Sequence, residues 1–69
     1  MKISARNKFV GKVKHITHGT VNSEVIIALP GGQELVSVIT ETSVQYLKLK
    51  TGSRVVAFIK ASNVLLAVP

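Results

Sequence analysis

Two short segments near opposite ends of the chain each combine a cation with hydroxyl groups and small neighbours. The first is residues 3–7, Ile-Ser-Ala-Arg-Asn, and the second is residues 60–62, Lys-Ala-Ser. A guanidinium or an ammonium supplies charge, the hydroxyls supply directional donors, and small residues let backbone N–H groups approach a ligand. Ser4 and Arg6 are two apart, so on an extended segment their side chains point to one face. These are the components of an anion-binding site.

Thr40 and Ser43 add a third group of donors. Residues 40–43, Thr-Glu-Thr-Ser, are typical of a helix start, with Thr40 as the N-cap and Glu41 suited to the positive end of the helix dipole. Free N–H groups at such a start also favour an anion. Because Glu41 would repel an anion if it faced inward, we expect its carboxylate to point to solvent.

Each of these residues taken alone has a plainer explanation. Arg6 and Lys60 are typical of solvated surface cations. Thr40 caps a helix whatever else it does, and a capping hydroxyl is less free to bind a ligand. Ser4 and Ser43 as single serines indicate nothing. Only the whole set, in this order along a short chain, predicts an anion site.

A site built only of donors suits a tetrahedral dianion such as molybdate, which has four acceptor oxygens and no proton at neutral pH. Monoprotonated phosphate is disfavoured there, because it leaves a donor unmet at a cost of about 1–3 kcal/mol. Rejection of sulfate depends on cavity size. Molybdate and tungstate have nearly the same size and charge, so such a site scarcely separates them.

With these residues, the chain resembles the molbindins, small molybdate- or tungstate-binding proteins also called molybdenum-pterin-binding proteins. The resemblance covers essentially all 69 residues. It rests on the opening pentapeptide, the Gly-Gly turn at 31–32, Thr40 with Ser43, and the segment 60–62.

The resemblance implies an oxyanion site between subunits, and a second class of site near a threefold axis. The positions that match the main site are Ser4, Arg6, Thr40, Ser43, Lys60, Ala61 and Ser62. For the second site the candidates are Asn22 and the His18-Gly19 turn. The implied assembly is a homohexamer, arranged as a trimer of dimers with an exchanged N-terminal strand. The ligand is molybdate or tungstate, and no pterin site is visible.

Size and composition favour self-association of one small domain, residues 1–69. A chain this short buries only about 60% of its unfolded surface, and with no cysteine it has no disulfide to stabilise it. Yet 46% of its residues are hydrophobic, in runs of strand length, so a neighbouring subunit is the natural second cover. No apolar run approaches the ~18 residues of a membrane span. No secretory leader is visible, so we expect a cytoplasmic protein.

The net charge of +6 attracts anions of some kind, and nucleic acid is the alternative partner. Lys12 and Lys14 share one face of an expected strand. However, single-strand binders stack bases on exposed aromatic side chains, and this chain has only three aromatic residues, so nucleic acid binding is disfavoured. No catalytic motif is present, His15 and His18 lack an acid or cysteine nearby, and we expect neither an enzyme nor a metal-cation site.

The spacing of apolar runs and turn residues predicts a mainly β fold. The expected strands cover residues 3–16, 20–29, 33–40, 54–60 and 63–68. Gly11 suggests a bulge, and Pro30-Gly31-Gly32 a tight turn. Five strands with one short helix between the third and fourth match a five-stranded OB-type Greek-key barrel.

We therefore expect a protein that binds molybdate or tungstate at subunit interfaces for intracellular storage or homeostasis. Related domains also occur, by the same resemblance, within molybdate-responsive regulators and transporter ATPases. The start Met and the full set of expected strands favour a free-standing protein over such a module.

Overall fold

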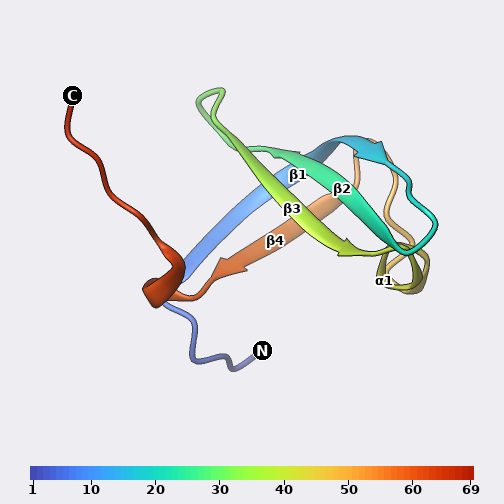
Figure 1. The fold of residues 1–69 in the computed structure, drawn as a ribbon, viewed down its shortest axis with the longest axis horizontal. Coiled ribbons are helices and arrows are strands. Elements are labelled where there is room, and N and C mark those ends of the chain that lie inside the picture. Colours follow the sequence, from blue (N-terminus) through green and yellow to red (C-terminus); the bar gives the residue numbers. More distant parts are fainter.

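Short runs of β-branched residues separated by Gly, Pro and Asn form four antiparallel strands in the computed structural model, which describes residues 1–69 (Figure 1). The elements in chain order are β1 (Asn7–Thr17), β2 (Asn22–Ala28), β3 (Glu34–Thr40), α1 (Glu41–Tyr46), β4 (Arg54–Ile59) and a 3-10 turn, η1 (Ala61–Asn63). The strand order in the sheet is β3-β2-β1-β4. The mainly β prediction and the helix between the third and fourth strands are confirmed. No helix here combines the length and the apolar content that crossing a bilayer requires.

The bulge in β1 does not lie at Gly11, where it was predicted, but farther along the strand, between Val13 and His15. The register against β2 shifts between Val13 and His15, while Gly11 pairs regularly with Val55 of β4. Gly11 is needed for a different reason, because a Cβ there would lie 2.5 Å from the carbonyl oxygen of Ala28. The glycine therefore permits close approach of two strands.

The core is small. Its fully buried hydrophobic residues are Val13, Val25, Ile27 and Val44. Val44 projects from α1, so the helix closes one end of the curled sheet. Four buried side chains are few for a chain of this hydrophobicity, which agrees with the expectation that one core cannot cover all its apolar residues.

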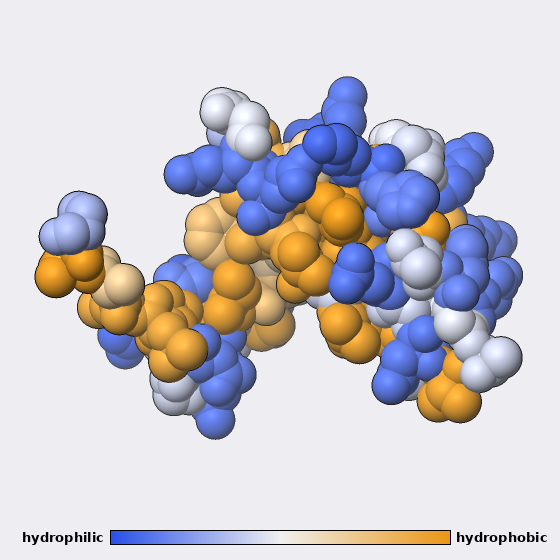
Figure 2. Space-filling view, turned by 45° about the horizontal axis from the view of Figure 1, so that its top comes forward, coloured by the Kyte–Doolittle hydropathy of each residue, from blue (hydrophilic) through white to orange (hydrophobic).

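The prediction of a fifth strand is wrong for the single chain. Residues 61–63 form η1, and residues 64–69 extend away from the sheet (red in Figure 1). Leu65 and Leu66 are each 92% exposed. A strand needs a partner strand for its backbone groups, and the one backbone hydrogen bond of this segment is the turn bond of 3.2 Å that the Val64 amide donates to the Ala61 carbonyl. Figure 2 shows hydrophobic side chains along this C-terminal segment, which projects at the left.

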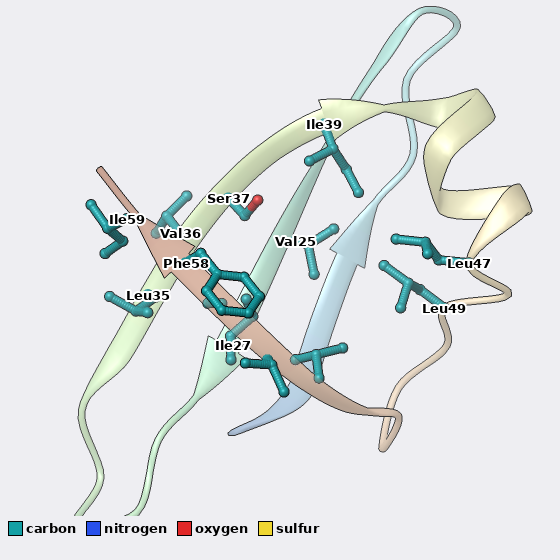
Figure 3. A pocket seen from close by; sticks show the side chains of 13 residues that line it. Val25, Ile27, Leu35, Val36, Ser37, Ile39, Leu47, Leu49, Phe58 and Ile59 are labelled. Atoms are coloured by element: carbon teal, nitrogen blue, oxygen red, sulfur yellow. The ribbon is translucent and has the colours of Figure 1, made fainter. Parts of the chain in front are cut away.

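Without a fifth strand the sheet forms an open half-barrel with an apolar trough on its concave face. The trough has a volume of about 310 Å³ and is lined by side chains from β2, β3, β4 and the connection between α1 and β4. Figure 3 shows these side chains facing the same hollow, with Phe58 from β4 among Val25, Ile27 and Leu35. Ser37 is the single polar residue of the lining. The interior expected for a closed barrel is therefore open along one side.

Candidate anion site

The two basic segments predicted from the sequence lie next to each other. β1 and β4 are antiparallel neighbours whose last pair is Asn7 with Ile59. The Asn7 side-chain amide also donates a hydrogen bond of 3.1 Å to the Ile59 carbonyl. The segment entering β1 and the segment leaving β4 must therefore meet at this end of the sheet.

A pocket of about 500 Å³ forms where they meet, and we call it the terminal pocket. Its lining is residues 3–6 and 60–62, which includes the predicted Ser4, Arg6, Lys60, Ala61 and Ser62. Two cations and two hydroxyls face it, and no carboxylate lines it. The first hydrogen bond of η1 is donated by Asn63 to the Lys60 carbonyl, at 2.9 Å. The amides of residues 61 and 62 precede that bond, so they are available as further donors.

Thr40 and Ser43 are not part of the terminal pocket of the same chain. They lie where β3 meets α1, and β3 is the strand at the opposite edge of the sheet from β4. Thr40 is the N-cap, as predicted: its hydroxyl accepts a 3.0 Å hydrogen bond from the Ser43 amide and donates one of 2.7 Å to the Ser43 hydroxyl. The Ser43 hydroxyl thus keeps its own proton for another acceptor.

The residues expected for the second oxyanion site lie beside Thr40 instead. Asn22 is directly opposite Thr40 in the β2–β3 pairing. Gly19 is in the preceding turn, and its amide donates a 3.2 Å hydrogen bond to the Ser23 hydroxyl. One chain therefore divides the predicted residues into two groups, one where β1 begins and β4 ends and one where β2 begins and β3 ends.

The expectation that Glu41 points to solvent is wrong. Its side chain is only 23% exposed and turns onto β2 and the turn before it. The carboxylate accepts hydrogen bonds of 2.6 Å from the Gln45 amide and 2.7 Å from the Ser23 hydroxyl, and lies 2.7 Å from the His18 ring. These bonds, that of Gln45 first and then that of His18, lower the pKa of Glu41 to about 2. The carboxylate is not in the terminal pocket, so that pocket remains free of acceptors.

Ser23, which the sequence did not single out, orients the Glu41 carboxylate. It is 2% exposed, and its hydroxyl connects the Gly19 amide to the Glu41 carboxylate. Its position in the alternation was the available signal, since Ser23 shares the inward parity of Val25 and Ile27. His18, expected to be a free turn residue without an acid nearby, is held by Glu41. No group of three metal-ligating side chains forms around them.

A family model described as the TOBE domain matches residues 3–66. The chain belongs to the TOBE-domain family. A probable molybdenum-pterin-binding protein of Haemophilus influenzae is 44% identical over 68 residues, covering 99% of each chain. The resemblance to molbindins is therefore confirmed, and none of these names is that of an enzyme.

Longer relatives contain the same unit. The molybdenum transport protein ModE of Herbaspirillum seropedicae is 44% identical over 66 residues, and the chain spans 24% of its length. Among solved structures, a molybdate-binding protein from Sporomusa ovata has a TM-score of 0.92 at 41% identity, covering 99% of this chain and all of that one. The cytoplasmic molybdate-binding protein ModG, with molybdate bound, has a TM-score of 0.96 at 51% identity, covering this whole chain and 49% of ModG. The fold is thus that of molybdate-binding proteins.

Proposed function

We propose that this TOBE-domain protein binds molybdate, or the equivalent tungstate, in sites shared between subunits, as a cytoplasmic store or buffer of the ion. The terminal pocket is the observation that carries the proposal. It gathers Arg6, Lys60 and the hydroxyls of Ser4 and Ser62 around a space that no carboxylate enters. Such a lining suits an unprotonated dianion and disfavours one that carries a proton. ModG and the Sporomusa ovata protein, both molybdate-binding proteins, agree with this chemistry.

The site is completed, in this proposal, by Thr40 and Ser43 of a neighbouring subunit. These two residues do not line the terminal pocket of their own chain, and the Ser43 hydroxyl still has a proton to donate. A contact that brings the β3–α1 corner of one subunit to residues 60–62 of another would supply them. Residue 61 contributes its backbone amide, as the resemblance implies.

The C-terminal segment provides a reason for subunits to approach in this way. Residues 64–68, Val-Leu-Leu-Ala-Val, are exposed, and the trough between β3 and β4 is open, apolar and without a strand to fill it. β1 pairs with β2 and β4 of its own chain. We therefore place the strand exchange at the C-terminal segment and not at the N-terminal strand. A trimer of dimers is the assembly that we propose from these contacts and from the family.

Native mass spectrometry tests this function directly. The protein is titrated with molybdate in the presence of an equal excess of sulfate, first as the parent chain and then as Arg6→Gln and Lys60→Gln. We expect an oligomer that takes up several molybdate ions, and a loss of about 10–100-fold in affinity in each variant, since hydrogen bonds to charged groups contribute about 1.5–3 kcal/mol. Lys50→Gln, an exposed cation outside the pocket, is the control. A monomer, or an oligomer that binds both ions equally, contradicts the proposal.

A further inference from the structure

A second basic cavity lies on the convex side of the sheet, away from the terminal pocket. Lys12 of β1 and Arg54 of β4 are directly opposite each other in the antiparallel pairing. Lys12 lies between the buried residues Gly11 and Val13, so its side chain points to the opposite, solvent-exposed face of the sheet. The Arg6–Lys60 group lies at the other end of the same strand pair, six residues or roughly 20 Å away.

These two cations have no anionic partner within the chain. Of the three acids, Glu34 binds Lys14 and Glu41 binds His18. Glu24 is opposite Thr17 and Val38, toward the far end of β2. Like charges directly opposite in a sheet are destabilising. An anion from outside the chain that binds between Lys12 and Arg54 would therefore relieve their repulsion.

The cavity that holds the pair is mostly apolar. It has a volume of about 360 Å³, and it is lined by Val10, Gly11, Ala28, Leu29 and Pro30 together with Lys12 and Arg54. That volume is in the lower part of the range for small-molecule sites. A bare tetrahedral oxyanion would turn some of its oxygens toward walls that offer no donor. The lining instead matches a ligand with an anionic end and an apolar body.

We propose that this cavity binds a phosphate monoester of a small apolar group, independently of the oxyanion function. Lys12 and Arg54 together carry two positive charges and eight N–H donors, and the Arg fork binds two phosphate oxygens at once. A monoester near neutral pH carries a charge close to −2. Its organic body packs against Val10, Leu29 and Pro30. No aromatic platform for stacked bases lines the cavity, so a nucleic acid strand fits it less well.

The test uses phenyl phosphate as the probe and amide chemical shifts of the intact protein as the readout. We expect shifts at residues 10–12, 28–29 and 54, and a loss of affinity of about tenfold or more in Lys12→Gln and in Arg54→Gln. The matched control is Lys8→Gln, because Lys8 lies on the same face of β1 and its loss changes net charge equally. We expect that control to bind within about twofold of the parent. Lys12→Gln should melt no lower than the parent, since it removes like-charge repulsion.

Four results would overturn the inference. Inorganic phosphate that binds as tightly as phenyl phosphate shows that the apolar walls contribute nothing. An equal loss in Lys8→Gln shows general charge attraction. Competition by molybdate for the phenyl phosphate shows that both ions use one site. A single-stranded oligonucleotide that binds at physiological salt through Lys12 and Arg54, with phenyl phosphate ignored, shows a nucleic-acid surface. Apart from the molybdate competition, these results do not depend on whether molybdate binds at the terminal pocket.

Discussion

Replacing two leucines of the C-terminal segment should dissociate the assembly while leaving the subunit folded. In the single chain Leu65 and Leu66 are 92% exposed, so Leu65→Ser/Leu66→Ser removes no contact of the monomer fold. Adjacent side chains of an extended segment point to opposite faces, so a neighbouring trough buries one of the two leucines, and replacing both covers either register. The loss of that burial weakens each contact by about 1.5–3 kcal/mol, or roughly 10–10²-fold in its dissociation constant.

Sedimentation velocity over a dilution series measures this change, with circular dichroism to show that the sheet is retained. The control is Tyr46→Ser, an 84% exposed apolar side chain at the end of α1 that does not line the trough. We expect the double variant to dissociate at concentrations where the parent and the control stay assembled. An unchanged dissociation profile, or a parent that is already monomeric, would refute the placement of the segment in a neighbouring trough.

Three further predictions concern the fold around the site. The pKa of Glu41 falls from an ordinary 4.5 to about 2, so its stabilising effect is complete above pH about 4.5 and is lost as the pH falls toward 2. Urea unfolding midpoints across this range should drop in the parent but stay flat in Glu41→Gln. Parallel pH curves for the two proteins would contradict the role of the carboxylate. Thr40→Ala removes the cap that the Ser43 amide uses and should cost about 1 kcal/mol in urea unfolding; no change would mean that the cap bond is not formed in solution. Gly11→Ala places a methyl 2.5 Å from the Ala28 carbonyl and should cost about 1–3 kcal/mol by overpacking, unless a neutral result shows that the strands can separate.

Local pattern was sufficient to predict the four strands and the helix. The Pro30-Gly31-Gly32 turn separates two runs of β-branched residues, and both glycines have a φ of 92°, which only glycine adopts readily. Thr40 and Glu41 marked the helix start because capping chemistry depends on residues close in sequence. The run 63–68 has the same composition as a strand. Its pairing partner is not a property of that run, and so its failure to pair within the chain was not predictable.

The candidate site was predictable to the same extent. Residues 3–6 and 60–62 meet because they flank neighbouring antiparallel strands, which follows once β1 and β4 are paired. The orientation of Glu41 depended on His18 and Ser23, which lie 23 and 18 residues earlier and come close only through the β2–β3 register. The expected repulsion between this carboxylate and a bound anion did not predict its orientation correctly. Three hydrogen bonds within the fold decide where that carboxylate lies.

The order of the C-terminal residues connects ion binding to assembly in the proposed function. Lys60-Ala61-Ser62 lines the terminal pocket, and the apolar segment begins two residues later, at Val64. An ion held by residues 60–62 therefore restrains the start of the segment that we place in the neighbouring trough. Ligand bound only to the assembled state stabilises it by about 2.7 kcal/mol per site at a hundred times the dissociation constant. Molybdate should accordingly shift the dissociation profile of the parent to lower protein concentration, and at the same molybdate concentration Arg6→Gln should reduce that stabilisation to about 0.4–1.4 kcal/mol per site without dissociating the assembly itself.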